Sequence, residues 1–482
     1  MTEPQSPTEP QRPTEPQSPT EPESQTGPAE APETDDDYAL DPALVAAVMA
    51  ALDDKDRAAV REAIADLHVA DIADLVEQIA PERRKRFIKF AWTDLDPAFL
   101  VELEEGVRDQ ILTLLKPREL AEAAREFETD DIVYLLSDLL PGAQREVLAA
   151  LDPGDRVAVA RSLSYPDYSA GRLMQTELVR APSFWTVGQM IDYLRANKHL
   201  PERFYDVVVV DASMKPVGLI PLATILGHRR PVTLGSLMHE DMRSFHVEDA
   251  QEDVAYAFKQ YHLVSAPVTD DDGRLVGVIT IDDAVEAMDE EAEEDLKRLG
   301  GVGDEEISDS VWAIVKRRFP WLAVNLLTAI LASLVIAQFD ETIAQVVALA
   351  VLMPIVASMG GNAGTQSLTV AVRALATRDL TPTNALRVVW RETVVGLLNG
   401  VGFAVVMGAV AVFWFGDPAI GGVIAVAMVI NLVAAALAGI LVPLVLDRVG
   451  ADPALASGTF VTTVTDVVGF LAFLGLAALV LL

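Results

Sequence analysis

The sequence has no cysteine and only six histidines among its 482 residues. Without cysteine the chain has no disulfide bonds, thiolate metal sites or cysteine nucleophiles. Basic residues are also scarce, because 37 lysines and arginines stand against 72 aspartates and glutamates, and the formal net charge is −35. This balance argues against nucleic-acid binding, which needs a concentrated basic face. The chain also lacks a phosphate-binding Gly-Lys loop, a metal-binding histidine pair at helical spacing and a convincing Ser/His/Asp set, so we expect no enzymatic activity.

The charge is unevenly distributed along the chain. From Trp321 onward there are five arginines, no lysine and eight acidic residues, so this part carries −3 and the preceding part −32. An acidic soluble part is therefore joined to an apolar part with few charges, and the sequence predicts a multidomain membrane protein. Residues 1–42 repeat Thr-Glu-Pro, cannot bury enough apolar surface to fold, and are predicted to be a disordered Pro/Glu-rich tail.

Residues 43–165 show apolar side chains at helical spacing in short blocks that end at prolines. The stretches that begin at Asp71 and Asp131 look alike and lie sixty residues apart. They predict stacked helical hairpins, that is, an all-α superhelical domain. An ordinary helical domain with acidic surface residues would suit this region equally well.

A clearer repeat lies in residues 170–288. Gly218 and Gly277 are 59 residues apart, and each stands between two strand-like runs with helix-like segments nearby. This duplicated α/β pattern resembles a tandem pair of CBS domains. The resemblance implies that adenine nucleotides such as ATP bind where a Thr-x-x-Asp turn follows the second strand. Thr280 and Asp283 fit that turn, whereas the first copy has Thr224 where the acid should stand, so at most one site is expected.

Residues 280–318 comprise an acidic connecting helix and a linker. The helix is predicted from Thr280 to Leu299, ending at Gly300 and Gly301, and it carries nine acidic residues. Like charges four residues apart destabilise a helix by roughly 0.2–0.5 kcal/mol per pair. A bound cation would relieve this repulsion, although such a charge run is often only a solvated face.

Residues 319–482 are predicted to form a transmembrane domain with five apolar spans. Each is long enough to cross about 30 Å of hydrocarbon, although the second is marginal. Basic residues lie on the same side as the soluble part, which places that part in the cytoplasm and the C-terminus outside the plasma (inner) membrane. The predicted spans are residues 321–339, 342–359, 393–415, 420–446 and 457–482.

Asp466 is the one ionisable residue deep inside an apolar stretch, and it follows Thr462, Thr463 and Thr465. A carboxylate at the bilayer centre costs about 2.5–3.5 kcal/mol, so such residues usually face a pore or a partner. The alternative is a protonated structural carboxyl that is hydrogen-bonded to threonine.

Two further features of the spans attract attention. Pro354 and the glycines that follow it are predicted to break the second helix and to expose backbone carbonyls beside the amides of Asn362 and Gln366, which would meet a hydrated cation. Asn431 lies in the middle of the fourth span, where an amide most often makes a helix-to-helix hydrogen bond. Oxygen ligands without cysteine or histidine select a hard cation such as Mg²⁺ or Ca²⁺.

Taken together, these features resemble the MgtE family of Mg²⁺ channels and transporters over residues 43–482. The features are the helical domain, the CBS pair, the acidic helix, five spans, the Gly-Gly-Asn-x-Gly-x-Gln segment at 360–366 and the Thr-Asp pair in the last span. The resemblance implies a homodimer in the lipid bilayer, with Asp466 holding hydrated Mg²⁺ in the pore and Asp452 at its cytoplasmic mouth. Asn362, Gln366 and Thr462 are the pore-lining candidates.

The resemblance also implies cytoplasmic Mg²⁺ sites that close the pore. The residues that match acids of those sites are Asp130, Glu252, Asp283, Glu286, Glu291, Glu294 and Asp295. Ala98, Ala250 and His262 stand where family acids can occur, and Lys259 lies in the same region, so some sites are expected to be weakened or relocated.

Electrostatics independently gives the direction of regulation. Divalent ions that bridge mutually repelling acidic domains favour a compact arrangement, so high cytosolic Mg²⁺ should close the path. Two rival functions remain: a membrane-anchored CBS nucleotide sensor, and a CBS-regulated secondary transporter of divalent cations. Competition by Co²⁺, Ni²⁺ or Mn²⁺ is left open by the sequence.

Overall fold

The computed structural model describes residues 40–482 apart from 138, 199, 202, 303–304 and 306–310. The predicted disordered tail lies outside the described residues up to residue 39. The first helix, α1, begins at Pro42.

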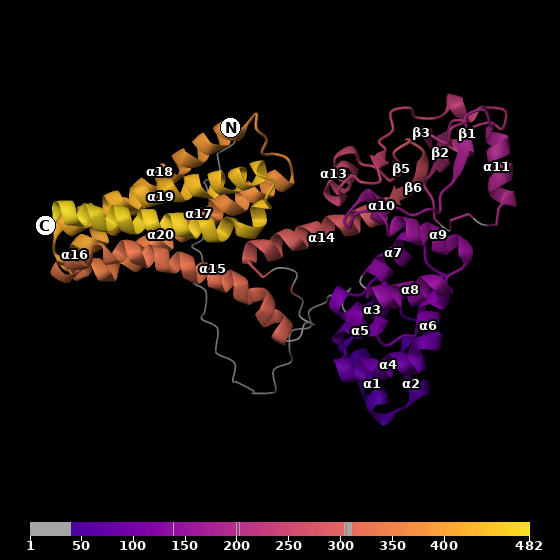
Figure 1. The fold of residues 1–482 in the computed structure, drawn as a ribbon, viewed down its shortest axis with the longest axis horizontal. Helices are drawn as coiled ribbons and strands as arrows, with labels where there is room; N and C mark the ends of the chain where they lie inside the picture. The colour runs from indigo at the N-terminus through magenta and orange to yellow at the C-terminus, as the bar shows by residue number, and fades with distance from the viewer. Residues whose placement is uncertain (1–39, 138, 199, 202, 303–304, 306–310) are drawn as a thin grey trace, which may run out of the picture.

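The N-terminal part is a helical domain, drawn in indigo and purple in Figure 1. Five of its described α-helices begin at a proline, which has no N–H to lose in the first turn and is pre-set to helical φ. Its core includes the fully buried side chains of Leu52, Phe87, Phe99 and Ile111. The elements are α1 (Pro42–Asp54), α2 (Arg57–Ile64), α3 (Val69–Gln78), α4 (Pro81–Ala91), η1 (Trp92–Asp94), η2 (Pro97–Leu100), α5 (Glu105–Leu112), α6 (Pro117–Ala123), α7 (Thr129–Ser137), α8 (Pro141–Ala150) and α9 (Pro153–Ser162).

The next part consists of two small sheets with the same topology. In each sheet the first two strands are parallel and the last two antiparallel, and the register shifts at the equivalent position. Gly218 pairs with Val209 and Gly277 pairs with Val268, so the two glycines are equivalent, as the repeat predicted. The elements are α10 (Ala170–Leu173), β1 (Arg180–Pro182), α11 (Val187–Ala196), β2 (Asp206–Val210), β3 (Pro216–Pro221), α12 (Leu222–Gly227), η3 (Leu234–Ser236), β4 (Phe245–His246), α13 (Gln251–Tyr261), β5 (Ser265–Thr269) and β6 (Leu275–Thr280).

A single acidic helix, α14 (Ile281–Gly300), leaves the second sheet and runs toward the membrane domain (Figure 1). It begins with a capping box, because the Thr280 backbone N–H and hydroxyl both donate to Asp283. It ends at Gly301, whose φ of +70° is left-handed and therefore suits glycine. The sequence predicted this helix with nearly the same bounds.

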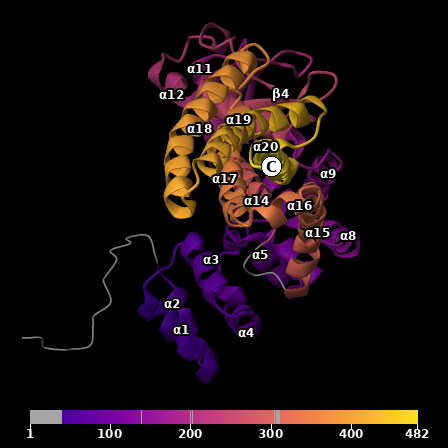
Figure 2. The ribbon, with the colours of Figure 1, turned by 90° about the vertical axis from the view of Figure 1, so that its left-hand side faces the viewer.

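The described residues contain five helices long and apolar enough to span a membrane, as predicted. They extend beyond the predicted spans at most ends, and a short helix follows the first of them. Figure 2 views the bundle end-on, with α18 and α15 on opposite sides and α19 and α20 between them. The elements are α15 (Val311–Ala337), α16 (Asp340–Gln345), α17 (Ala348–Ala376), α18 (Ala385–Phe415), α19 (Pro418–Arg448) and α20 (Pro453–Val480).

The predicted break in the second span is wrong. α17 continues through Pro354 and through the glycine-rich segment to Ala376. Inside a bilayer each backbone group must find a partner within the protein, so one proline that removes one hydrogen bond does not end the helix. The glycines serve packing instead: a Cβ at Gly364 would lie 2.6 Å from the side chain of Val461 on α20.

Candidate functional site

Asp466 lies in the middle of α20 and is half-buried within the chain. The hydroxyls of its threonine neighbours donate to carbonyls of the same helix: Thr462 to Gly458 at 2.9 Å, and Thr465 to Thr462 at 2.9 Å. Thr463 likewise donates to a carbonyl one turn earlier at 2.6 Å. These hydroxyl protons are therefore not available to the Asp466 carboxylate, which weakens the reading of Asp466 as a structural carboxyl that accepts from threonine.

The pore-lining candidates of α17, Asn362 and Gln366, lie one turn apart on the exposed side of the helix. The Asn362 Nδ2 atom lies 3.5 Å from the Ser358 hydroxyl of the preceding turn. Thr462 is also exposed. In the single chain, polar side chains of α17 and α20 thus reach the outside of the bundle at membrane depth.

Asp452 precedes the first turn of α20 and caps it, accepting a hydrogen bond from the Ala454 N–H at 2.7 Å. The other carboxylate oxygen lies 2.6 Å from the guanidinium of Arg298 on α14. Arg298 also pairs with Glu294, one turn back on its own helix. The acidic helix therefore reaches the start of α20 and is tied to it by a basic residue.

A group of acids lies along α14 just before that contact. Glu291 is half-buried, and burial together with the nearby charges of Glu252 and Asp295 raises its pKa to about 7. Burial and the neighbouring Asp452 and Glu252 also raise the pKa of Asp295. The structure thus brings Glu252 of α13 close to the predicted regulatory acids of α14.

A second acidic group forms where the start of α14 meets α7 of the helical domain. Asp130 is buried, and burial and the nearby Asp283 raise its pKa well above its usual range. Burial raises the pKa of Asp283 to about 6, with Asp282 and Asp131 adding to the effect. Glu286 still reaches solvent, yet partial burial beneath the helical domain and the charge of Glu290 raise its pKa to about 7.

Two acids of this group were missed by sequence reasoning. Burial raises the pKa of Glu128 to about 7 and that of Asp131 to about 6, with charges of Glu177 and Asp282 contributing. Glu177 also accepts hydrogen bonds from the Thr129 backbone N–H at 3.1 Å and hydroxyl at 2.7 Å, which fixes the start of α7 to the CBS-like pair. The dense acids at 126–131 were the available signal.

The described residues contain no group of three or more acids or histidines that could hold a metal ion directly. The carboxylates are nevertheless close enough for their charges to raise one another's pKa. Mg²⁺ dehydrates reluctantly and usually keeps several waters, so carboxylates can hold it through water as well as directly.

The departures from the family pattern occupy helix ends. Ala250 is the N-cap residue of α13 and provides no side-chain cap, while His262 ends the same helix with a left-handed φ of 53°. Lys259 lies exposed in the last turn of α13, and Ala98 lies in η2, where its N–H donates to Asp96 at 3.0 Å.

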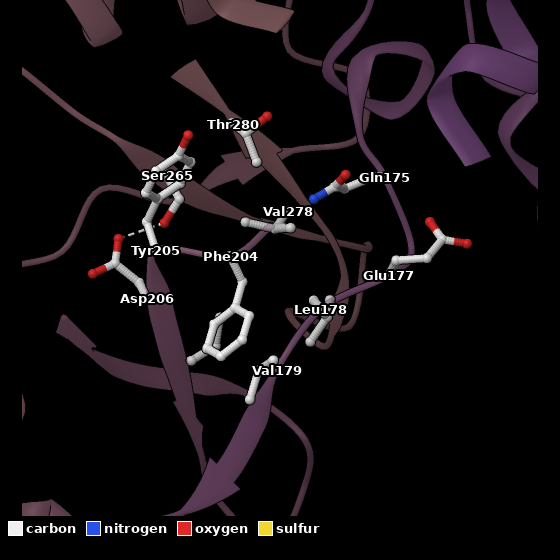
Figure 3. A pocket seen from close by; sticks show the side chains of 11 residues that line it. Gln175, Glu177, Leu178, Val179, Phe204, Tyr205, Asp206, Ser265, Val278 and Thr280 are labelled. Atoms are coloured by element: carbon white, nitrogen blue, oxygen red, sulfur yellow. Dashed lines mark hydrogen bonds between the residues drawn. The ribbon is translucent and has the colours of Figure 1, made fainter. Parts of the chain in front are cut away.

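A small cavity lies between the two sheets of the CBS-like pair (Figure 3). Thr280 lines it, and the Ser265 hydroxyl donates to Asp206 across it at 2.6 Å. Its free space is about 10 Å³, room for about one water molecule. Asp283 does not line the cavity and is engaged by Thr280. Nucleotide binding by Thr280 and Asp283 thus stays a prediction that requires the cavity to open.

A second contact joins the soluble part to the membrane domain. Arg378, in the loop between α17 and α18, pairs with Asp253 of α13. Its guanidinium also lies 4.6 Å from the ring centre of Tyr256, one turn further along α13. This contact ties the loop to α13, the helix that shares a hydrophobic core with the second CBS-like sheet.

The sequence matches three family profiles. The MgtE profile, described as a divalent cation transporter, covers residues 353–476, the MgtE intracellular N domain covers residues 67–168, and a CBS domain covers residues 234–290. The chain is also 31% identical over 463 residues to the magnesium transporter MgtE of Thermus thermophilus, covering 91% of this chain and 98% of the relative. The chain belongs to the MgtE family. It is therefore a multi-pass membrane protein with cytosolic domains, in a family of magnesium transporters.

The chain is also similar to a further relative and to two solved structures. MgtE of Bacillus subtilis is 27% identical over 418 residues, covering 86% of this chain and 93% of the relative. Among solved structures, the soluble part of a magnesium transporter has a TM-score of 0.44 at 27% identity, covering 52% of this chain and 98% of that chain. The cytosolic domain of the Mg²⁺ channel MgtE in complex with ATP has a TM-score of 0.46 at 26% identity, covering 50% of this chain and 99% of that chain.

Proposed function

We propose that this MgtE protein is a Mg²⁺-selective uptake channel that closes when cytosolic Mg²⁺ rises. It acts as a homodimer in the plasma membrane, with the C-terminus outside. The observation that carries the proposal is the path of α14, whose acids crowd against α7 and α13 and whose end is paired with Asp452 at the start of α20.

Permeation rests on Asp466. Its carboxylate lies at membrane depth, and the hydroxyl protons of the neighbouring threonines are donated to the backbone. A carboxylate there attracts a divalent cation that keeps part of its water shell. Lys, Arg and His are absent from the middle of the spans, so no basic side chain of the spans replaces the ion.

The exposed polar side chains of Asn362, Gln366 and Thr462 support a second copy of the chain. Hydrocarbon cannot satisfy amide and hydroxyl groups, so side chains of this kind face protein or water within a membrane. A homodimer that places α17 and α20 at its centre covers these groups and lines a polar path with two Asp466 carboxylates.

Closure rests on like-charge repulsion. The raised pKa values of Glu286 and Glu291, both about 7, show that these carboxylates are held where negative charge is unfavourable. Mg²⁺ between the carboxylates stabilises this compact arrangement, so it shifts the population toward the closed state by its differential affinity. The ions are held by Asp130, Asp283 and Glu286 on one side, and by Glu252, Glu291, Glu294 and Asp295 on the other.

The deciding experiment is Mg²⁺ flux into liposomes that contain the full chain, followed with a Mg²⁺-sensitive dye inside the vesicles. We expect wild type to admit Mg²⁺ and the isosteric variant Asp466→Asn to lose most of the flux. Asp417→Asn, at the cap of α19 near the opposite membrane face, is the matched control and should conduct normally. No Mg²⁺ flux through wild type would favour a membrane-anchored nucleotide sensor, and equal flux through Asp466→Asn and wild type would remove Asp466 from the ion path.

Three finer points are tested with the same reconstituted protein. Single-channel currents separate a channel from a secondary transporter, which turns over too slowly to give them. Addition of Co²⁺, Ni²⁺ or Mn²⁺ measures competition at the Asp466 site, and ATP titration of the full chain tests whether the cavity beside Thr280 opens for a nucleotide.

A further inference from the structure

Asn431 lies where α17, α19 and α20 meet. Its side chain is 0% exposed, and its Nδ2 atom donates to the Val356 carbonyl of α17 at 2.8 Å. The helix-to-helix hydrogen bond predicted from the sequence is thereby confirmed.

The amide of Asn431 fits between two glycines of different helices. A Cβ atom at Gly360 of α17 would lie 2.3 Å from the Asn431 Nδ2 atom, and one at Gly469 of α20 would lie 2.8 Å from it. Real side chains do not approach so closely, so the amide occupies the space that both glycines leave. The size of this amide therefore sets how closely α17 and α20 approach α19.

The hydrogen bonding of Asn431 is incomplete. Its Oδ1 atom is buried and accepts no hydrogen bond from any residue that the structure describes. An unpaired buried acceptor opposes folding, and leucine would fill a similar volume without this penalty. Stability alone therefore does not account for an amide at this position.

The two glycines connect Asn431 to the proposed ion path. Gly469 follows Asp466 by three residues, which places both on neighbouring positions of one face of α20. Gly360 precedes Asn362 by two residues on α17. A change in the amide thus moves the helices that carry the candidate pore residues.

We propose that Asn431 is a positioning residue for ion permeation. It sets the spacing of α17 and α20 and so fixes the width of the path at Asp466, which decides between hydrated Mg²⁺ and the larger Ca²⁺. The inference rests on the proposed function, because it requires Asp466 to lie on the ion path.

The test compares Mg²⁺ and Ca²⁺ flux in liposomes for wild type, Asn431→Leu and Asn431→Asp. The neutral carboxyl group that Asn431→Asp introduces would keep the shape of the amide and donate its hydroxyl to the Val356 carbonyl, because an apolar site favours the uncharged form.

We expect Asn431→Leu to change the Mg²⁺/Ca²⁺ flux ratio about tenfold, since small misplacements in an ion path have large effects, while Asn431→Asp stays within about twofold of wild type. A purely structural role would lower the amount of folded protein without changing the ratio.

Gly469→Ala gives a second, independent test. The added methyl group displaces the Asn431 amide, so this variant should share the altered ratio. Gly422→Ala is the control, because no atom lies within 4 Å of the new methyl group on α19, and it should leave the Mg²⁺/Ca²⁺ flux ratio unchanged.

If Asn431→Leu fails to fold, Gly469→Ala decides the question. Unchanged Mg²⁺/Ca²⁺ flux ratios in both Asn431→Leu and Gly469→Ala would overturn the inference. The proposed function would still stand in that case if Asp466→Asn is inactive in the same assay. If Asp466→Asn conducts as well as wild type, Asp466 does not lie on the ion path, and the part of the proposed function on which this inference rests fails.

Discussion

The guanidinium of Arg298 lies 2.6 Å from the carboxylate of Asp452, so a positively charged side chain of α14 occupies the proposed pore mouth. The same guanidinium pairs with Glu294. Arg298 thus lies between two carboxylates that a divalent ion would otherwise bridge. This contact ties the end of α14 to the start of α20.

Replacing Arg298 should therefore favour the open state at low Mg²⁺. The two side chains are 33% and 27% exposed, and a pair of this kind contributes about 1 kcal/mol, or about fivefold in the ratio of closed to open protein. We expect Arg298→Gln to raise the open probability of single channels in Mg²⁺-free solution. Arg298→Lys keeps the positive charge and should raise the open probability less.

Lys297→Gln is the control for charge, because Lys297 pairs with Glu293 within α14 at 2.8 Å. An equal increase in open probability for both variants would show that the net charge of α14, rather than the contact with Asp452, controls the gate.

Removing the acids at the end of α14 should abolish closure by Mg²⁺. We expect the triple variant Glu291→Ala, Glu294→Ala, Asp295→Ala to stay open in patch recordings at internal Mg²⁺ that closes wild type, because the ions that stabilise the compact arrangement lose their ligands. The double variant Asp289→Ala, Glu293→Ala removes exposed acids of the same helix and should close normally. Unaltered inhibition of the triple variant would exclude these residues as the sensor.

Acid should mimic Mg²⁺. The carboxyl groups of Glu286 and Glu291 have pKa values of about 7 in the compact arrangement, so they bind protons more tightly there than when they are separated from their neighbours. Their contribution to compaction is fully present below their ordinary pKa of 4.5 and is lost as the pH rises through about 7. Without Mg²⁺, the protein should thus be more compact at low pH than at high pH within this window.

Energy transfer between dyes measures this compaction. The absence of native cysteine allows specific labelling at Glu62→Cys on α2 and Asp289→Cys on α14, both exposed. Transfer should rise on acidification, and less so when Glu286 and Glu291 are also replaced by glutamine. A pH response that is unchanged by these replacements would assign the effect to other groups.

The contact of Arg378 with Asp253 and Tyr256 should couple the second CBS-like sheet to the membrane helices. We expect Arg378→Gln to weaken Mg²⁺ inhibition, shifting the half-inhibitory concentration upward about two- to fivefold, since an exposed ion pair with a cation–π contact contributes at most about 1 kcal/mol. Arg387→Gln, in the first turn of α18, is the control. An unchanged inhibition curve would show that coupling passes through α14 alone.

Several features of the fold could be predicted from the sequence because they depend on local pattern. The repeated glycine between paired strands and the acidic helix from Thr280 to Leu299 both follow from patterns that extend over a few residues. The apolar spans were predictable for the same reason, since length and composition suffice to identify a membrane helix.

The errors came from features that depend on tertiary contacts. Pro354 and Gly360 read as a helix break, but neighbouring helices pack against this segment and α17 continues. Glu128 and Asp131 were overlooked because only the docking of α7 against α14 shows which side of α7 is crowded by other acids. Arg298 was overlooked because its partner lies 154 residues away in the chain.

The uninterrupted 20 residues of α14 make it a lever arm. At 1.5 Å per residue it measures about 30 Å, so a tilt of about 10° at its CBS-like end swings the far end by about 5 Å. A movement of that size is enough to separate Arg298 from Asp452. Under the proposed gating, a modest ion-driven rearrangement of the cytosolic domains would thereby be magnified where α14 meets the membrane domain.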